Sequence, residues 1–458
     1  MQPRILRVAS GQGFWGDDLE APIRQVENGP IDYLMLDYLA EVTMSVLQKL
    51  RARDPGHGFA RDFIPLMERI FATCVERGIS VVTNAGGVNP SACTDEVLRV
   101  GREAGVAGRA RVGTVLGDDL MERLDNTLLA EGHDLCNMDT GAPCAGIRER
   151  VRAANVYFGA EPIVRALGLG ANSVVTGRAA DAALAYAPMI HEFEWRWDDW
   201  DRLAAGVVAG HIIECGAQSS GGNCLVDWWS IPNLAEIGFP IVEVSPDGSF
   251  VVTKHDGSGG RVDRATVTEQ IVYEIGDPRA YITPDVVADF TTIELEYGGS
   301  DRVLVGRVRG RAATDFLKVS IAYSAGFKAV GTLTYAWPDA AAKARLAART
   351  LAARLERLGL DLELRADLVG WDSTHGPLAG EPPPDLPEVQ LRVAVRGQRR
   401  SAVERFTREV APLVLTGPPT VTGYAGGRPR VEEIVAFWPA LIRGEVVEPH
   451  LTVEVVDA

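Results

Sequence analysis

The amino-acid sequence predicts an α/β protein in which a mainly parallel sheet with flanking helices carries a β-rich extension and is followed by a small α+β domain. Three observations lead to this prediction. Short apolar segments alternate with amphipathic ones over the first 190 residues, helix-like segments become rare between about 225 and 335, and a long alanine- and arginine-rich segment follows. Strands that alternate with helices need crossover connections, which place neighbouring strands parallel.

The first part of the chain supplies the parallel strands and their helices. Its strand-like runs are almost continuously apolar, which is typical of strands covered on both faces. We expect strands at 5–9, 31–36, 79–83, 111–116, 155–158 and 173–176. Apolar residues at three- and four-residue spacing predict a helix at 59–75, and further helices are expected at 96–103, 161–167 and 178–186. An open, doubly wound sheet is favoured, and a barrel is the alternative.

The second part of the chain is richer in strands. Between about 225 and 335 we expect strands without long helices between them, at 241–244, 250–253, 265–272, 291–297, 302–309 and 316–322. This β-rich extension completes a first domain over residues 1–337. Residues 338–458 predict a small α+β domain with a ferredoxin-like arrangement. Its helices are expected at 340–358 and 401–410 and its strands at 360–364, 389–396 and 451–456.

Composition and charge narrow the classes of function. The 458 residues are 46% hydrophobic and 24% charged, as in an ordinary globular chain with a large core. The formal net charge of −16 argues against nucleic acids and anionic membranes as partners. No apolar run reaches the roughly 18–20 residues of a membrane span, and the start of the chain lacks the apolar run of a secretion signal. We therefore expect a cytoplasmic protein and, from general frequency, a homo-oligomer.

The six cysteines and seven histidines are scattered along the chain. They form no C-x-x-C pair and no H-E-x-x-H motif, and six distant cysteines are too sparse for a disulfide framework. The sequence therefore predicts neither a metal site nor a redox centre.

Ligands of parallel α/β sheets bind at the carboxyl ends of the strands, so the loops there form the candidate site. The loop after the first strand contains Gly11, Gly13, Phe14 and Asp17, and its glycines permit close approach to the backbone. Residues 11–16 match the dinucleotide pattern G-x-G-x-x-G, but Phe14 is bulky for a pyrophosphate turn. A substrate loop is favoured over a nicotinamide site, and a purely structural turn is the other alternative.

Two later loops add amide and charged groups at the starts of helices. The loop after the strand at 79–83 is either a ligand-binding loop or only a helix cap and a tight turn. In the loop after the strand at 173–176, Arg178 begins a helix, where a cation is unfavourable unless an anion holds it. That anion is Asp181 or a carboxylate or phosphate of the ligand. The candidate contacts of the earlier loop are Asn84, Gly86, Gly87 and Asn89.

The stretch 209–223 is the richest in reactive groups. If 203–216 is a helix, His211, Glu214 and Cys215 share one face. A histidine beside an orienting carboxylate suits general acid–base catalysis, and a thiolate nucleophile would also need that histidine. The alternative is an interior helix with a hydrogen-bonded histidine and an inert cysteine. Two turns that offer further donors or charges, unless they are only solvated turns, contain Gly221, Gly222, Asn223, Lys254 and Asp256.

Taken together, these loops resemble the acyclic terpene utilisation (AtuA) family. The resemblance rests on the order and spacing of the motifs over residues 4–335, and the residues beyond resemble the family's small ferredoxin-like C-terminal domain. The motifs are GQGFWGD at 11–17, DYLAE at 37–41, NAGGVNP at 84–90, TGRAAD at 176–181, GHIIEC at 210–215, GGN at 221–223 and KHDG at 254–257.

The resemblance implies a role in the bacterial breakdown of branched acyclic terpenes and similar acids as CoA thioesters, beside acyl-CoA carboxylases and hydratases. It also implies a lyase or hydratase step on a thioester of the 3-hydroxy-glutaryl type. No resident cofactor or metal is expected, and the substrate would be carried on CoA or an acyl carrier protein.

The leading hypothesis is a lyase that acts on a branched or 3-hydroxy acyl thioester, by addition or loss of water or by retro-aldol cleavage. Such a reaction needs a base that takes a proton and donors that stabilise the thioester enolate. His211 or Glu214 would be the base. The Asn84 and Asn223 loops would supply the donors, and Arg178 would anchor an anionic group of the substrate.

Asp37, from the motif at 37–41, joins the glycine-rich loops among the expected substrate contacts. Two other functions stay open. One is a thioester hydrolase or acyltransferase with Cys215 as the nucleophile. The other is a non-enzymatic partner of an acyl-CoA carboxylase complex.

Overall fold

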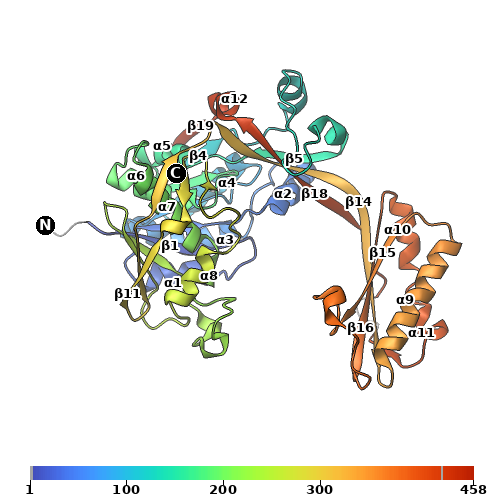
Figure 1. The fold of residues 1–458 in the computed structure, drawn as a ribbon. Helices are drawn as coiled ribbons and strands as arrows, with labels where there is room; N and C mark the ends of the chain where they lie inside the picture. Colours follow the sequence, from blue (N-terminus) through green and yellow to red (C-terminus); the bar gives the residue numbers. More distant parts are fainter. Residues whose placement is uncertain (1–3, 424–426) are drawn as a thin grey trace. The chain divides into compact units, whose positions relative to one another are not determined.

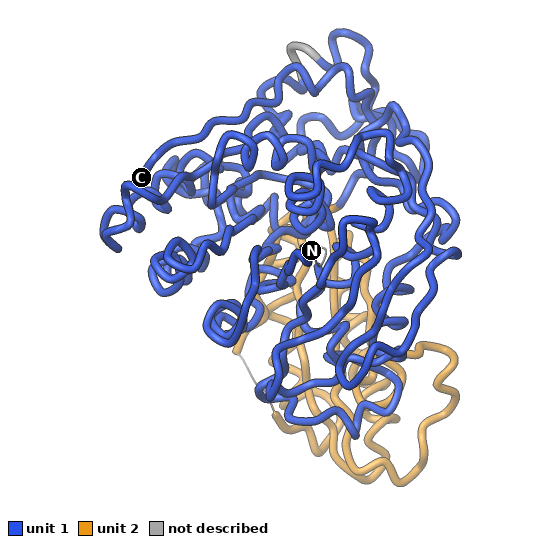
Figure 2. The backbone as a smooth tube through the Cα atoms, turned by 90° about the vertical axis from the view of Figure 1, so that its left-hand side faces the viewer, with its two compact units in different colours: residues 1–322, 437–458 blue, residues 323–436 orange. Residues whose placement is uncertain are grey.

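The computed structural model describes residues 4–423 and 427–458, which form two compact units (Figure 1). Unit 1 comprises Met1–Ala322 and Phe437–Ala458, and unit 2 comprises Tyr323–Ala436; Figure 2 draws them in blue and orange. The division after residue 322 differs from the predicted boundary at 337/338, because the 21-residue strand β14 (Phe316–Ala336) contributes to both units. Among the described residues, no helix is both long and apolar enough to cross a membrane.

Unit 1 is built on an open, mixed sheet of ten strands. They are β1 (Leu6–Gln12), β2 (Tyr33–Leu36), β3 (Ser80–Thr83), β4 (Arg111–Leu116), β6 (Ser173–Thr176), β7 (Ile241–Val244), β8 (Phe250–Thr253), β11 (Glu294–Gly299), β12 (Arg302–Gly306) and β19 (Thr452–Asp457). Their order is β11-β12-β8-β7-β1-β2-β3-β6-β4-β19.

The direction of the strands changes across this sheet. The run β1-β2-β3-β6-β4 pairs in parallel, whereas the pairings of β7, β8, β11, β12 and β19 are antiparallel. The prediction of a mainly parallel sheet is therefore wrong for the sheet as a whole and correct only for its centre. Helices connect the parallel strands, while β7 with β8 and β11 with β12 form hairpins, which need only short connections.

Helices cover both faces of the parallel centre. They are α1 (Ala21–Asn28), α3 (Phe63–Arg77), α4 (Pro90–Glu103), α5 (Glu161–Gly168), α6 (Ala183–Phe193) and α7 (Trp200–Glu214). Alternate residues of a strand point to opposite faces. Val8, Met35 and Val82 accordingly share one core with α5, α6 and α7, while Leu34 and Leu36 face α1, which contacts α3. Residues 203–213 of α7 are all buried, as expected for a helix that is apolar on every side.

Three segments fold differently from the expectation. Residues 265–272, expected as a strand, form the helix α8 (Arg264–Ile271), because the Asp263 carboxylate accepts from the backbone N–H groups of Ala265 and Thr266 and caps it. The strand β5 (Val151–Val156) pairs with β14 and lies outside the parallel run. The strand expected at 451–456 in the small domain is β19, which pairs with β4 in unit 1.

Unit 2 has its own core. Its elements are α9 (Ala340–Arg357), β15 (Glu363–Val369), β16 (Glu388–Gly397), α10 (Arg400–Thr407), β17 (Val421–Thr422) and the first part of β18 (Glu432–Arg443). The strands follow the order β15-β16-β14-β17, and β18 also pairs with β14. Leu351 and Phe406 pack the helices onto the sheet. A ferredoxin-like arrangement stays a prediction, which this order of elements favours.

Gly117 follows β4 at a position that fits only glycine. Its φ is +112°, and an added Cβ would lie 2.4 Å from the carbonyl oxygen of His450, just before β19. We predict that Gly117→Ala lowers the free energy of unfolding by about 2 kcal/mol or more, because the strain of the positive φ adds to the steric overlap between the new Cβ and the His450 carbonyl oxygen. Urea unfolding measures the loss. Gly108→Ala, where an added Cβ meets nothing within 4 Å, is the control; equal stability of the two variants would contradict the contact.

Candidate functional site

Four buried polar side chains follow the parallel strands at their carboxyl ends. They are Asp37 after β2, Asn84 after β3, Arg178 after β6 and Asp118 after β4. Because the strands run in the same direction, these ends meet at one edge of the sheet. Three residues of the predicted site, Asp37, Asn84 and Arg178, therefore lie together at this edge.

Arg178 is enclosed by groups of the protein. Its Nη2 donates to the Tyr157 hydroxyl at 3.0 Å, and its backbone N–H donates to the Asp118 carboxylate at 2.8 Å. Its Nη1 donates to the Leu39 carbonyl oxygen and lies 3.0 Å from Asp181 Oδ1. The guanidinium carbon lies 4.3 Å from the centre of the Tyr157 ring. Arg178 is thus an internal counter-ion that joins several loops, and this geometry disfavours its expected role as the anchor of a substrate anion.

Asp37 and Asn84 form a hydrogen-bonded pair near Arg178. The Asn84 Nδ2 donates to Asp37 Oδ1 at 2.7 Å, and the Asn84 amide oxygen accepts from the backbone N–H of Tyr38 at 2.7 Å. Burial raises the pKa of Asp37 to about 6, although Arg178 and Asn84 favour the ionised form. The geometry therefore favours a role of Asn84 in orienting Asp37 over its expected role as an oxyanion donor.

Asp181 is the partly open carboxyl of this group. About 35% of its side chain is exposed, and its Oδ1 lies beside the Arg178 guanidinium. Burial raises the pKa of Asp181 well above its ordinary value; Arg178 opposes this shift, and the carboxylates of Asp37 and Glu214 add to it. The charge of Asp37 therefore disfavours the ionised form of Asp181.

His211 lies in the buried helix α7 and is only 2% exposed. Its Nδ1 is 2.9 Å from Glu214 Oε1, its Nε2 is 2.9 Å from the Gln270 carbonyl oxygen, and the rings of Tyr281 and Phe290 pack against it. Burial lowers the pKa of His211, but Glu214 and the Gln270 carbonyl raise it, and the net shift is upward. Nε2 must donate to a carbonyl oxygen, so the imidazole offers a substrate no free lone pair. The expected role of His211 as the base is therefore not favoured.

Glu214 is oriented by His211. Its Oε1 contacts the imidazole, whereas its buried Oε2 has no hydrogen-bond partner among the described residues, and 13% of the side chain is exposed. Its charge raises the pKa of both Asp37 and Asp181, so these groups lie near one another. We call Asp37, Asp181 and Glu214, with Arg178, the carboxylate cluster. A fixed carboxylate with an unshared oxygen is suited to accept a proton.

Cys215, next to this cluster, is a poor nucleophile. Burial, followed by the Glu214 carboxylate, raises the pKa of its thiol to about 12, so little thiolate exists at neutral pH. Its backbone packs against the loop after β1, where a Cβ added at Gly13 would lie 2.7 Å from the Gly216 nitrogen. A Cβ added at Gly86 would similarly lie 2.5 Å from the Thr176 carbonyl oxygen. Gly13 and Gly86 therefore serve the close packing of loops.

The other residues of the predicted site make their contacts elsewhere. The buried Lys254 pairs with Asp301 at 3.3 Å and donates to the Ser258 carbonyl oxygen at 2.9 Å, which fixes its own turn. Asn223 donates to Gln218 Oε1 at 3.2 Å. Within the described ranges, no hydrogen bond or ion pair joins the carboxylate cluster to Gly11, Phe14, Asp17, Gly87, Asn89, Gly221, Gly222 or Asp256.

Tyr157 and Lys318, which the sequence did not single out, contact the cluster or its neighbours, as does Asp118, which follows the predicted strand at 111–116. The Tyr157 hydroxyl donates to Glu41 at 2.9 Å, and Lys318 lies 3.4 Å from the same carboxylate. Asp118 accepts from Asn155 Nδ2 at 3.0 Å, and burial raises its pKa to about 7. A place directly after the strand β5 is the signal that could have identified Tyr157.

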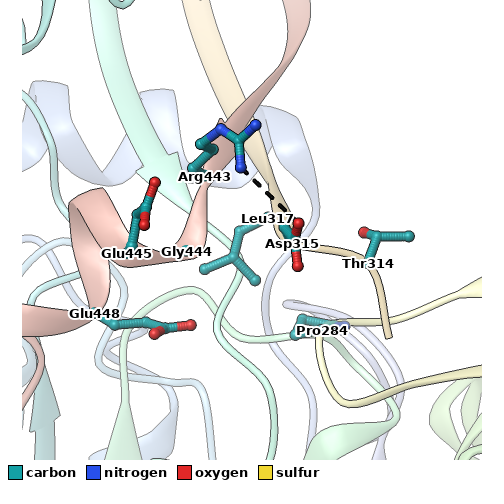
Figure 3. A pocket seen from close by; sticks show the side chains of 8 residues that line it. All are labelled: Pro284, Thr314, Asp315, Leu317, Arg443, Gly444, Glu445 and Glu448. Atoms are coloured by element: carbon teal, nitrogen blue, oxygen red, sulfur yellow. Dashed lines mark ion pairs between the residues drawn. The ribbon is translucent and has the colours of Figure 1, made fainter. Parts of the chain in front are cut away.

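One cavity lies next to Asp118, which contacts Arg178, and another lies away from the cluster. Asp118 lines a cavity of about 340 Å³ together with Arg51 and Arg123. Another cavity, of about 370 Å³, lies around Asp315 and Glu448 and contains none of the predicted site residues (Figure 3). Among the described residues, no three His, Cys, Asp or Glu side chains form a group that could hold a metal ion.

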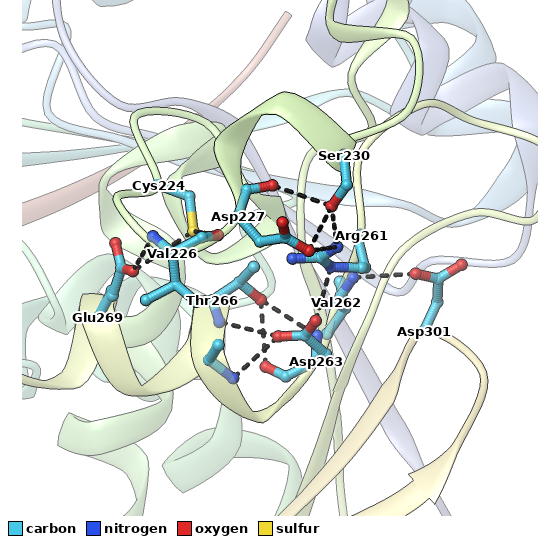
Figure 4. Close-up of polar contacts among 11 residues, drawn as sticks. Cys224, Val226, Asp227, Ser230, Arg261, Val262, Asp263, Thr266, Glu269 and Asp301 are labelled. Atoms are coloured by element: carbon cyan, nitrogen blue, oxygen red, sulfur yellow. Dashed lines mark hydrogen bonds and ion pairs between the residues drawn. The ribbon is translucent and has the colours of Figure 1, made fainter.

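The loop that follows α7 is held in place by ionic and backbone contacts. The Glu269 carboxylate accepts from the backbone N–H groups of Leu225 and Val226 at 2.8 and 2.9 Å. Arg261 lies 2.6 Å from Asp263 and 3.8 Å from Asp227 (Figure 4). The contacts of Glu269 and Arg261 thus hold residues 225–227 of this loop in place.

A family model described as acyclic terpene utilisation family protein AtuA matches residues 6–453. The match spans almost the whole chain, and the chain therefore belongs to this family. No curated protein and no solved structure matches the chain. Family membership places the chain in acyclic terpene utilisation and leaves its reaction to be proposed.

Asp118 makes the stability of the protein depend on pH. Its pKa of about 7 in the folded protein lies above the ordinary 3.8, so the folded state holds an extra proton between these values. The free energy of unfolding therefore falls as the pH rises through that range. We predict that Asp118→Asn makes this decline shallower between pH 5 and pH 7 in urea unfolding. The exposed control Asp198→Asn keeps the wild-type slope, and an unchanged slope for Asp118→Asn would contradict the assignment.

Proposed function

We propose that this AtuA family member is a lyase that acts on a branched or 3-hydroxy acyl thioester. The observation that carries the proposal is the carboxylate cluster at the carboxyl edge of the parallel strands. It combines a carboxyl of raised pKa, Asp181, with an oriented carboxylate, Glu214, that keeps one oxygen unshared. The acyl group would be carried on CoA or an acyl carrier protein, and no resident cofactor enters the scheme.

Loss of water from a 3-hydroxyacyl thioester needs two proton transfers. Glu214 takes a proton from the carbon next to the thioester carbonyl, and the electron pair of that bond forms the carbon–carbon double bond. The bond from carbon 3 to its hydroxyl breaks, and Asp181 gives its proton to the leaving hydroxyl, which departs as water. Hydration of the enoyl thioester is the reverse of these steps.

Retro-aldol cleavage uses the same two groups. The base takes the proton of the 3-hydroxyl, the bond between carbons 2 and 3 breaks, and a ketone or aldehyde leaves. The acid then protonates the thioester enolate at carbon 2. The cluster is compatible with either reaction, because each moves one proton onto a carboxylate and one from a carboxyl group.

The neighbours of the cluster take supporting roles in this proposal. His211 fixes Glu214 through Oε1, Asn84 fixes Asp37, and Arg178 holds Asp181 and stabilises negative charge beside it. The alternative with Cys215 as the nucleophile is less well supported, because a thiol with a pKa of about 12 is seldom ionised near neutral pH.

A panel of 3-hydroxyacyl and enoyl thioesters tests the proposal, with mass spectrometry to follow each acyl group. Loss or gain of water, or release of a carbonyl fragment, supports a lyase. Release of the free thiol with an intact acid supports the hydrolase instead. No change with any thioester, together with tight binding to an acyl-CoA carboxylase subunit, supports the non-enzymatic partner.

We predict that Asp181→Asn and Glu214→Gln each lower kcat by about 10²- to 10⁴-fold, because each removes one proton transfer. Turnover of the active thioester is the measurement, with circular dichroism to check the fold. The exposed Asp198→Asn keeps wild-type turnover. Cys215→Ser also retains activity under the lyase scheme, and its inactivation with an intact fold would favour the thiol mechanism.

A further inference from the structure

The loop that follows α7 exposes several large apolar side chains next to the end of α8. Glu269 of α8 accepts from the backbone N–H groups of Leu225 and Val226, so the loop lies against this helix (Figure 4). Val272 follows Glu269 by three positions, about one helical turn, and lies on the same side of α8. We call the exposed side chains of this region the apolar patch. They are Leu225 (83% exposed), Val226 (52%), Trp228 (60%), Trp229 (70%) and Val272 (63%).

The area of the apolar patch is close to what one side of a dimer interface needs. A tryptophan side chain covers up to about 250 Å² when it is buried, so the exposed fractions of Trp228 and Trp229 correspond to about 300 Å². The three aliphatic side chains add about 200 Å². A standard interface takes about 800 Å² from each partner, of which about 500 Å² is apolar. The apolar patch alone supplies that apolar area.

The loop that carries the two tryptophans is already ordered. Besides the contacts of Glu269, Arg261 donates through Nη1 to the Ser230 hydroxyl at 2.8 Å and pairs with Asp227 at 3.8 Å. The rings of Trp228 and Trp229 lie edge to face, with their centres 5.6 Å apart. Because these groups hold the loop before any partner arrives, association would cost little conformational entropy. The backbone N–H groups that Glu269 binds would also stay paired when the patch is covered.

The charges around the loop indicate which kind of partner fits. Asp227, Asp263 and Glu269 surround the loop with carboxylates, and Arg261 pairs with the first two. Loops and helices that bind membrane surfaces usually carry lysine and arginine beside their apolar residues, so a lipid surface is disfavoured. The patch itself carries no charge. Two identical patches can therefore meet across a twofold axis without bringing like charges into contact.

We propose that the apolar patch is the twofold contact through which two copies of this chain form a dimer. Trp228 and Trp229 of one copy pack against the same patch of the second copy, which removes all four indoles from water. Tryptophans at the centre of an interface contribute a large share of its binding energy. The proposal goes beyond the proposed lyase reaction and does not depend on it.

Sedimentation velocity of the full-length chain tests the proposal. The wild type is expected to be a dimer at about 20 µM, because standard interfaces have Kd values of micromolar or lower. The double variant Trp228→Ser, Trp229→Ser should weaken the dimer by about 100-fold or more and sediment as a monomer. Circular dichroism and urea unfolding check the fold, which should be unchanged because both indoles are largely exposed.

Tyr297→Ser is the matched control. Tyr297 lies on β11, the edge strand of the ten-stranded sheet, and is 86% exposed, more than either tryptophan. This variant also removes an exposed aromatic ring, but from a surface outside the apolar patch, so it should keep the wild-type Kd.

A wild-type monomer at this concentration would overturn the proposal. A dimer whose Kd is unchanged in the double tryptophan variant, or one that Tyr297→Ser breaks, would also overturn it and would place the contact on another surface. A monomer that co-sediments with phosphatidylcholine vesicles, and loses this binding in the double variant, would assign the patch to a lipid surface instead.

Discussion

The buried guanidinium of Arg178 is the constraint on which the site depends. A charge removed from water is costly unless partners replace its hydration, and the penalty for an unpaired ion is several kcal/mol. Arg178 finds these partners in Asp181, the Tyr157 hydroxyl and the Leu39 carbonyl oxygen. They lie in the loops after β6, β5 and β2, so the contacts that satisfy one ion also fix three loops relative to one another.

The parallel centre of unit 1 could be predicted because its signal is local. Each apolar strand is followed by an amphipathic helix, and this alternation alone implies parallel neighbours. The antiparallel flanks of the sheet could not be predicted, because the sequence of a strand does not reveal which other strand it pairs with. β19 is the extreme case, since Thr452 pairs with Leu116, more than 300 residues earlier. A strand was expected in place of the helix α8 because the segment contains β-branched residues, which favour strands. The helix forms because Asp263 caps its first turn.

The sequence could predict which residues of the site are neighbours, but not which hydrogen bonds their atoms make. Helical spacing placed His211 and Glu214 on one face, and they do make contact. Spacing cannot show that the second ring nitrogen of His211 is hydrogen-bonded to the carbonyl oxygen of Gln270, 59 positions away. The apolar composition of α7 on every side was the available warning, because such a helix is buried together with its polar residues.

Burial raises the pKa of the carboxyl groups at this edge and also the pKa of the neighbouring thiol. Arg178 does not lose its proton, and both ring nitrogens of His211 are engaged. Transferable protons therefore reside on carboxyl groups, where burial raises the pKa of Asp37 to about 6 and that of Asp181 well above its ordinary value. The same burial, with Glu214 close by, raises the pKa of Cys215 to about 12. An environment that keeps a carboxyl protonated also suppresses a thiolate, because each effect is a penalty on placing negative charge there. This environment is therefore compatible with the proton transfers of the proposed lyase and disfavours attack by the Cys215 sulfur.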